Sequence, residues 1–365
     1  MRITLDATPL LGQRTGIGRY TAHLIAELPA ATARAGLAAD LAVSTWTARG
    51  GALTDLPTGV HQVGRRVPAR LLRECWRRVA FPPVELVSGP TRLFHGTNFV
   101  APPTRGAATV VTVHDLTYDL HAATVSRDSL LYRELVPRAL ARGAHVLCPS
   151  EAVVHAVRDH YGLPADRVSC TPLGVDPAWS TAEPPPARWL QERGLPREYV
   201  VFVGSLDPRK NLPRLLSAHA ALRAADPSTP DLVLAGPAGR EQHLASAGVH
   251  LTGFLPDDEL RALVAGSVAL ALPSLDEGFG LPAVEAAAAG RPVLAADVPV
   301  LREVAGADTV LADPLDVDAL AGGLAAVLAL PDDEPARAAR RSAAAPFTWA
   351  RTADATVAAY LTVLR

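Results

Sequence analysis

Two adjacent cations are the side chains of this sequence best suited to bind a diphosphate. Arg209 and Lys210 follow the run Phe202-Val203-Gly204 and precede a helical pattern that starts at Leu212. Arginine offers a planar fork of donors and lysine a point charge, and a helix N-terminus adds a favourable dipole. The alternative is a solvated pair with Asn211 as the N-cap of the helix.

Two spaced carboxylates suit a hydroxylated ligand. Glu277 lies in a loop after the apolar run Val268–Leu272, and Glu285 lies about one turn into the next helix. Between them, Gly278 and Gly280 expose backbone N–H groups near the start of that helix. Carboxylates accept hydrogen bonds from vicinal hydroxyls, so this pair suits a sugar and a ribose. A carboxylate favoured only by the helix dipole is the alternative for Glu277, whereas Glu285 lies too far into the helix to be a cap.

A glycine-marked turn follows the first apolar run of the chain. Gly12, Gly16 and Gly18 stand between that run and a long helical pattern. Glycines at a strand-to-helix turn let backbone N–H groups approach an anion. The spacing matches neither the dinucleotide-binding G-x-G-x-x-G nor a P-loop, which disfavours a nicotinamide or ATP site. A tight turn without a ligand is the alternative.

The elements that must position these residues alternate along the whole chain. Short apolar runs separated by helical patterns predict an α/β protein with doubly wound parallel sheets, whose ligands bind at the carboxyl ends of the strands. Long helices are expected at Ile17–Ala35 and Ser129–Arg142. The expected strands are Arg2–Asp6, Asp40–Val43, Arg92–His95, Thr109–Val113, His145–Cys148, Arg167–Thr171, Tyr199–Val203, Leu232–Ala235, His250–Thr252, Val268–Leu272, Pro292–Ala296 and Thr309–Leu311.

Length and composition fit two soluble domains. The 365 residues are 49% hydrophobic and 20% charged, and about 150 residues per domain gives two domains. Lys+Arg 35 against Asp+Glu 37 leaves a net charge of -2, which disfavours a dedicated nucleic-acid binder. We expect no secretory signal, no membrane span and no disulfide framework, hence a cytoplasmic protein. The proline-rich stretch 172–186, with its triple proline, is expected to be part of the link between the domains.

The carboxylate spacing resembles a family motif. Glu277-x7-Glu285, with Gly278-Phe279-Gly280 inside it, is similar to the E-x7-E motif of the retaining GT-B glycosyltransferases of family GT4. Short matches that are less specific one by one extend the resemblance over nearly the whole chain. They are the N-terminal glycine turn, His114-Asp115, Pro149-Ser150, Pro172–Asp176, Gly204 with Arg209–Asn211, and Trp349 in the last helix. The resemblance implies a GT-B fold, in which two Rossmann-like domains face one cleft. Residues 1–172 would form the acceptor-side domain, with the helix at 348–365 packing back on it, and residues 173–347 the donor-binding domain.

The resemblance also implies a role for each site residue. Arg209 and Lys210 would clamp the donor diphosphate and stabilise the charge of the departing nucleoside diphosphate. Glu277 would hold hydroxyls of the donor sugar, and His114 would lie beside the reacting sugar, near its 6-hydroxyl or the acceptor. The remaining residues of the implied nucleotide-sugar site are Gly16, Gly18, Gly204, Ser205, Phe254 near the base, Phe279, Gly280, Leu281 and, on the ribose, Glu285.

Two departures from the family pattern affect the chemistry. Many members carry Arg or Lys where this chain has Ser205, so the clamp would rest on Arg209 and Lys210. A metal-dependent Asp-x-Asp is missing, since the runs Asp257–Glu259 and Asp332–Glu334 look like helix starts, so we expect no metal and no other cofactor. Retention in this family is pictured as front-face attack in which the departing phosphate takes the acceptor proton. We therefore assign no general base.

The substrates implied are a nucleotide diphosphate sugar and a hydroxyl-bearing acceptor. Similarity to bacterial mannosyltransferases around residues 16–20 and 204–211 favours GDP-mannose, with a UDP-sugar as the alternative. The acceptor would be a glycan, a lipid-linked glycan or a small molecule. The alternative to an enzyme is a non-catalytic protein of the same fold that binds a sugar nucleotide.

One arginine-rich stretch stands out in a nearly neutral chain. Residues 65–79 hold six arginines and one acid. Leu72, Cys75, Trp76 and Val79 fall at helical spacing, so a basic amphipathic helix could contact an anionic membrane through Arg65–Arg78, at its inner face. The alternative is a helix packed on its own domain, whose arginines are solvated or line the cleft for an anionic acceptor.

Overall fold

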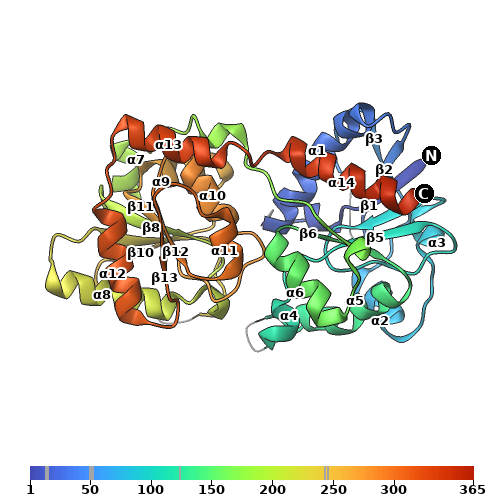
Figure 1. Cartoon of the computed structure of the whole chain (residues 1–365), viewed down its shortest axis with the longest axis horizontal. Coiled ribbons are helices and arrows are strands. Elements are labelled where there is room, and N and C mark those ends of the chain that lie inside the picture. The colour runs from blue at the N-terminus through green and yellow to red at the C-terminus, as the bar shows by residue number, and fades with distance from the viewer. Residues whose placement is uncertain (13–15, 49–52, 123–124, 242–243, 245) are drawn as a thin grey trace. The chain divides into compact units, whose positions relative to one another are not determined.

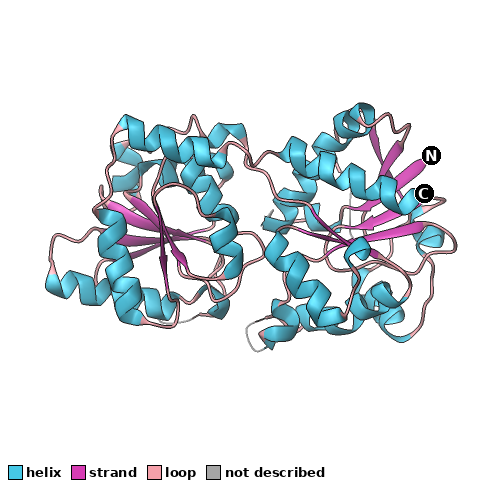
Figure 2. Ribbon diagram, in the orientation of Figure 1, coloured by secondary structure: helices cyan, strands magenta, loops and turns pink. Residues whose placement is uncertain are grey.

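The computed structural model describes residues 1–12, 16–48, 53–122, 125–241, 244 and 246–365 of the chain. It contains two compact units (Figure 1). Unit 1 consists of residues 1–174 together with 348–365, and unit 2 consists of residues 175–347. In each unit, helices cover both faces of a parallel sheet (Figure 2).

The sheet of unit 1 has seven parallel strands in the order β3-β2-β1-β4-β5-β6-β7. Six of them occur where the apolar runs predicted strands, with ends differing by one residue at most. Val60–Val63 was not predicted, because this half-exposed edge strand contains His61 and Gln62 and lacks an apolar run. The strands are β1 (Arg2–Asp6), β2 (Asp40–Ser44), β3 (Val60–Val63), β4 (Leu93–Gly96), β5 (Ala108–Thr112), β6 (His145–Cys148) and β7 (Val168–Cys170).

The helices of unit 1 include one from the far end of the chain. They are α1 (Gly16–Arg34), α2 (Ala69–Arg78), α3 (Val84–Ser88), α4 (Thr117–Leu120), α5 (Tyr132–Ala141), α6 (Glu151–Tyr161) and α14 (Trp349–Leu364). Helix α14 packs along α1 (Figure 1). The His23 and Trp349 rings stack at 4.6 Å, and the Tyr360 hydroxyl lies 2.7 Å from Nδ1 of His95. A Cβ on Gly174 would lie 2.1 Å from the backbone nitrogen of Trp349, so only glycine lets the backbone at residue 174 lie so close to the start of α14.

The sheet of unit 2 has six parallel strands in the order β10-β9-β8-β11-β12-β13. Its central strands are buried, as expected for strands covered on both faces. All six were predicted, again with small differences at their ends. They are β8 (Tyr199–Val203), β9 (Asp231–Ala235), β10 (Val249–Gly253), β11 (Ala269–Leu272), β12 (Val293–Ala296) and β13 (Thr309–Ala312).

Two helices of unit 2 begin at the acidic runs of the sequence. Asp257 opens α9, and the Asp333 side chain caps α13 by accepting a hydrogen bond from the Ala336 amide, so both acidic runs are helix starts as predicted. The helices are α7 (Ala187–Glu192), α8 (Leu212–Ala225), α9 (Asp257–Gly266), α10 (Leu281–Ala288), α11 (Pro299–Val304), α12 (Val317–Leu328) and α13 (Glu334–Ala344).

The triple proline is not a link between the units. The chain passes from unit 1 to unit 2 within the predicted stretch 172–186, between Gly174 and Val175, but residues 184–186 themselves belong to unit 2. Pro184 and Pro185 pack against Gly266 at the end of α9, where a Cβ on the glycine would lie 2.6 Å from Pro185 Cδ. The prolines therefore shape the entry to α7 within one unit.

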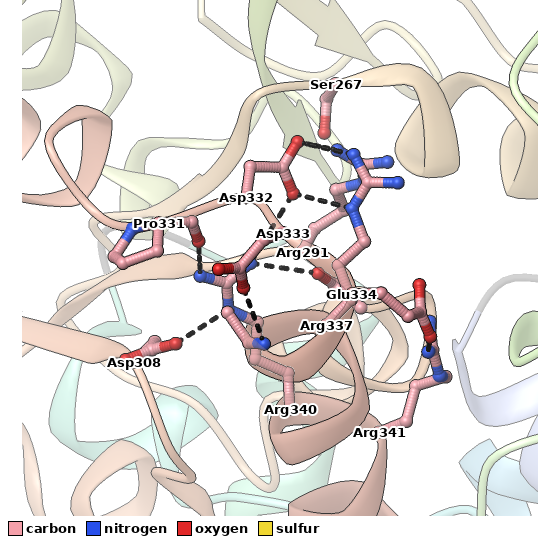
Figure 3. Close-up of polar contacts among 12 residues, drawn as sticks. Ser267, Arg291, Asp308, Pro331, Asp332, Asp333, Glu334, Arg337, Arg340 and Arg341 are labelled. Atoms are coloured by element: carbon pink, nitrogen blue, oxygen red, sulfur yellow. Dashed lines mark hydrogen bonds and ion pairs between the residues drawn. The ribbon is translucent and has the colours of Figure 1, made fainter.

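A fully buried arginine anchors α13. Arg340 donates from Nε to Asp308 at 2.9 Å and from Nη1 to the Gly290 carbonyl at 3.1 Å, and it also donates to the Pro331 carbonyl (Figure 3). Its charge is offset by Asp308 and by Asp332, 3.6 Å away. This one side chain fastens α13 to three separate loops, in keeping with the rule that buried charges are paired.

Among the described residues, no helix combines the length and the apolar character needed to cross a bilayer.

Candidate functional site

The candidate site lies at the switch point of the second sheet. The strands that follow β8 and those that follow β11 are added on opposite sides of this neighbouring pair, so the direction of strand order reverses between β8 and β11. In open parallel sheets, ligands bind at such a switch point, in a crevice at the carboxyl ends of the strands. Arg209 and Lys210 follow β8 on a short 3-10 helix, Pro208–Lys210. Glu277 follows β11. The topology thus brings together the cations and the first carboxylate that the sequence singled out.

Lys210 and Glu277 form a buried ion pair. Lys210 Nζ lies 2.5 Å from Glu277 Oε1, and the two side chains are 7% and 8% exposed. Ser274 Oγ donates to the same oxygen at 2.7 Å. Arg209 Nη1 lies 3.4 Å from the other oxygen, Oε2. The carboxylate is therefore held by two cations and a hydroxyl.

The electrostatics of the site keep Glu277 ionised. Burial opposes its charge, but the charges of Lys210 and Arg209 and the hydrogen bonds from Lys210 and Ser274 outweigh burial and lower the pKa of Glu277 to about 2. The site therefore holds fixed charges of both signs at neutral pH. Such preorganised charges stabilise a transition state more effectively than water does.

Backbone contacts fix the cation turn against the acidic loop. The Leu275 amide donates to the Arg209 carbonyl at 2.9 Å, and Arg209 Nη1 donates to the Asp276 carbonyl at 3.2 Å. Asn211, at φ 58°, has the left-handed backbone that ends this turn. Its Nδ2 donates to the carbonyls of Pro273 and Pro314 at 3.0 and 2.7 Å.

Asn211 is consequently not the side-chain N-cap that we considered. It occupies the cap position of α8 without a side-chain cap hydrogen bond. Its amide joins the loops after β11 and β13 to the turn after β8 instead. Ser274 and Asn211 are two residues of the site whose roles are not predicted from the sequence. Ser274 stands three residues before Glu277 in the same loop, and this spacing is the signal that could have indicated its hydrogen bond to the carboxylate.

The glycine-rich part of the acidic loop leads into α10. Gly280 adopts φ 85° at the N-cap position, and a Cβ there would lie 2.4 Å from Leu301 Cδ2. Phe279 and Leu281, on either side, are buried, and the Phe279 ring packs edge-on against Phe347 at 5.6 Å. Glu285 lies in α10 and is buried.

Three more residues of the predicted site lie at the same edge of this sheet. Gly204 directly follows β8, and Ser205 comes next. Phe254 directly follows β10 and is 42% exposed. In the order β10-β9-β8 it lies two strands from the cation turn.

The other predicted site residues belong to unit 1. Gly16 and Gly18 form the first turn of α1, and residues 13–15 of the glycine turn lie outside the described part of the chain. His114 follows β5, and its Nε2 lies 2.9 Å from the Thr97 carbonyl. Because a carbonyl only accepts, Nε2 carries the proton. Burial lowers the pKa of His114. The hydrogen bond to Thr97 and the charge of Asp115 act to raise this pKa but do not outweigh burial, so the ring is neutral at pH 7.

The arginine-rich helix is only partly as predicted. Helix α2 buries Leu72 and Trp76, and Trp76 packs edge-on against Trp46 of the same unit at 4.8 Å. Val79, predicted on the apolar face, lies past the helix end and is 54% exposed. The helix ends one residue before it, so the spacing no longer turns Val79 inward. The inward face of α2 is therefore used for packing within unit 1.

Within the described residues, no three His, Cys, Asp or Glu side chains are grouped as a metal site would require. The chemistry that the arrangement itself offers is binding of a diphosphate by Arg209 and Lys210 and of hydroxyls by a fixed carboxylate.

Comparison with known proteins accounts for both units. The family described as Glycosyltransferase Family 4 matches residues 14–179, and the family Glycosyl transferases group 1 matches residues 188–345. O-antigen chain mannosyltransferase B of Escherichia coli is 31% identical over 285 residues, 73% of this chain and 74% of that one. The MMP alpha-(1->4)-mannosyltransferase of Mycolicibacterium hassiacum is 32% identical over 290 residues, 73% and 68% of the two chains.

Solved structures share the architecture at low identity. Sucrose-phosphate synthase from Thermosynechococcus elongatus has a TM-score of 0.70 at 19% identity, over 99% of this chain and 98% of that one. Anabaena HepE in complex with UDP and glucose has a TM-score of 0.67 at 20% identity, over 99% of each chain. The two sheets, the site at the second switch point and these matches together place the protein: it belongs to the glycosyl transferases group 1, family GT4, and is a glycosyltransferase with the GT-B fold.

Proposed function

We propose that this enzyme transfers a hexose, with retention at the anomeric carbon, from a nucleotide diphosphate sugar to a hydroxyl of an acceptor. The observation that carries the proposal is the Arg209–Lys210–Glu277 cluster at the switch point of the second sheet. The guanidinium of Arg209 can make two parallel hydrogen bonds to a phosphate, and the ammonium of Lys210 adds a compact positive charge. The carboxylate of Glu277 stays ionised and can accept hydrogen bonds from the hydroxyls of a sugar.

The family resemblance suggests how these groups would act in the reaction. The bond between the anomeric carbon and the diphosphate oxygen breaks, and Arg209 and Lys210 stabilise the charge left on the nucleoside diphosphate. The acceptor oxygen bonds to the same face of that carbon, and its proton passes to the departing phosphate. Glu277 holds sugar hydroxyls, with the backbone amides of Phe279 and Gly280.

The rest of the nucleotide would lie along the same edge. Glu285 would bind the ribose and Phe254 would lie by the base. Gly204, Ser205 and Leu281 complete the donor site of unit 2, while unit 1 would contribute Gly16, Gly18 and His114 and bind the acceptor. Charge stabilisation by paired cations makes the reaction independent of a divalent metal, so activity should survive EDTA.

GDP-mannose is our first choice of donor, because the relatives named above are mannosyltransferases. A UDP-sugar is the alternative, since Anabaena HepE was solved with UDP. Thermal unfolding with GDP and with UDP separates the two, because a ligand that binds only the native state raises Tm with the logarithm of its concentration. Hydrolysis of GDP-mannose and UDP-glucose, with Lys210→Ala as the control, then tests the enzyme. A protein that neither nucleotide stabilises would contradict the proposal.

We also propose that the surface around α2 contacts an anionic membrane. Leu71 and Phe81 are each 58% exposed there, beside the exposed Arg70 and Arg78. Exposed apolar side chains among arginines are typical of surfaces that insert at a lipid interface. Flotation with anionic vesicles at low salt should retain the wild type and lose Leu71→Glu/Phe81→Glu. Absence of wild-type retention would refute this contact.

A further inference from the structure

The last residue of unit 2 contacts the acidic loop of the candidate site. Phe347 lies between the end of α13 and the start of α14. Its ring meets the ring of Phe279 edge-on, with the centroids 5.6 Å apart and the planes at 79°. Such edge-to-face pairs stabilise a contact beyond the apolar area that they bury. The contact joins the C-terminal end of the unit to the loop between the two carboxylates.

Backbone hydrogen bonds fix the position of Phe347. Its amide donates to the Ala344 carbonyl at 3.0 Å, and its carbonyl accepts from the Val175 amide at 3.0 Å. The next residue, Thr348, caps α14, because its Oγ1 accepts from the Arg351 amide at 3.3 Å. The Phe347 ring is therefore presented to the acidic loop by a firmly held backbone.

The loop residue that receives this contact lies between two glycines. Gly278 and Gly280 carry no side chain, so the Phe279 ring is the side chain that anchors residues 278–280. This ring is 4% exposed, and Gly280 has φ 85° where α10 begins. Glycine allows more backbone conformations than any other residue. The direction of the Phe279 and Gly280 amides therefore depends on where the Phe279 ring packs.

The cation turn is supported by other contacts. The Leu275 amide donates to the Arg209 carbonyl at 2.9 Å, and Asn211 Nδ2 donates to the Pro314 carbonyl at 2.7 Å. These contacts lie at the start of the loop after β11 and at the loop after β13, whereas the Phe347 ring meets the glycine-flanked end of the first loop. The supports of the proposed diphosphate and sugar contacts are thus separate.

We propose that Phe347 is a positioning residue for the donor sugar. Through the Phe279 ring, it fixes the backbone amides of Phe279 and Gly280 in the direction that the sugar hydroxyls require. This inference rests on the proposed function, because it takes those amides to contact the sugar. Loss of the Phe347 ring should weaken binding of the nucleotide sugar and leave binding of the nucleoside diphosphate unchanged.

Isothermal titration calorimetry on the whole protein compares the two ligands. The wild type and Phe347→Leu are titrated with GDP and GDP-mannose, or with UDP and UDP-glucose where UDP is the nucleotide that raises Tm. Phe347→Leu should raise the Kd of the nucleotide sugar about fivefold, the scale of a lost aromatic pair, and the Kd of the nucleoside diphosphate less than about twofold. A purely structural role would lower Tm without changing the ratio of the two Kd values.

Three further variants make the comparison specific. Trp189→Leu removes a ring elsewhere in unit 2, where it lies 4.0 Å from the guanidinium of Arg193. His23→Ala removes the ring that stacks on Trp349, close after Phe347 in the chain. Both controls should keep the wild-type ratio of Kd values. Phe279→Leu removes the same ring pair from its other side, should act as Phe347→Leu does, and replaces that variant if it fails to fold.

The results distinguish this inference from the proposed function. A wild type that binds neither nucleotide contradicts the proposed function and removes the basis of the inference. Where the wild type does bind, equal weakening of both ligands by Phe347→Leu, or no change in either, overturns the inference alone. A changed ratio in Trp189→Leu or His23→Ala also overturns it, because the effect would then not arise from the contact with Phe279.

Discussion

The ammonium of Lys210 lies 2.5 Å from a carboxylate oxygen of Glu277, where each side chain is more than nine-tenths buried. Desolvation of two charges is costly, and the pair is maintained because each ion compensates the other and Ser274 adds a hydrogen bond. Residues 67 positions apart in the chain are thereby fixed as one unit. The groups proposed to meet the diphosphate and the sugar are thus positioned by each other.

Removal of one member of this pair should damage both activity and stability. Lys210→Ala should lower the rate of donor hydrolysis and transfer by about a hundredfold or more, because a cation opposite the leaving group is lost. It should also lower the free energy of unfolding by about 3 kcal/mol, because Glu277 is left buried and unpaired. Donor hydrolysis and urea unfolding measure the two effects.

The double variant Lys210→Met/Glu277→Gln is the control. It has neither charge, so it should regain most of the lost stability while remaining inactive. Full hydrolysis by Lys210→Ala would contradict the assigned clamp, whatever its stability.

Stability should fall in acid in a window set by Glu277. Its pKa is lowered from 4.5 in the unfolded chain to about 2 in the fold, so its ionised form stabilises the protein above pH 4.5. That contribution, roughly 3 kcal/mol, is lost as the pH falls from about 4.5 toward 2. Urea unfolding at a series of pH values should show a smaller loss in Lys210→Met/Glu277→Gln. Equal slopes for the two proteins would exclude this role of the carboxylate.

Two substitutions of Asn211 distinguish the contribution of its side chain to stability from the contribution of its left-handed backbone. Asn211→Ala loses two buried hydrogen bonds, to Pro273 and Pro314, and puts alanine at φ 58°. We expect a loss of about 3 kcal/mol. Asn211→Gly loses the same bonds but tolerates the backbone, so it should be about 1 kcal/mol more stable than the alanine variant. Equal Tm values for the two variants would show that the left-handed backbone costs nothing.

Two neighbouring glycines of α12 should respond with opposite sign. A Cβ on Gly322 meets nothing within 4 Å, so Gly322→Ala should stabilise the helix, by about 0.5–1 kcal/mol. A Cβ on Gly323 would lie 2.6 Å from Leu294 Cδ1, so Gly323→Ala should destabilise the protein by about 1–3 kcal/mol. Thermal unfolding of both variants makes the comparison. Stabilisation by both substitutions would mean that Leu294 moves aside freely.

Much of the fold could be predicted because buried parallel strands are apolar from end to end. Leu270 and Val201 read as strand residues without any knowledge of their partners, and they pair with each other in the sheet. The edge strand at Val60–Val63 shows no such run, and Arg340 reads as a surface residue of a charged helix. Its burial depends on Asp308 and Gly290, which only the folded chain brings near.

The candidate site, too, could be predicted from the sequence only in part. The residue types of Arg209, Lys210 and Glu277 and their places after strands were enough to select them. That Lys210 and Glu277 pair with each other, and that Asn211 turns away from its helix, depends on strand order. Strand order sets β8 beside β11 and is not encoded in local spacing. Roles that rest on two loops meeting, such as that of Ser274 beside Lys210, therefore needed the structure.

Helix α14 has a consequence for how the protein is made. Unit 2 is one continuous segment, so all of its residues are synthesised before residues 349–364. Unit 1 waits for that helix, because α1 and His95 have their partners on it. Nascent unit 1 thus carries an uncovered apolar surface on α1 until the last residues of the chain have been synthesised and α14 can pack against it.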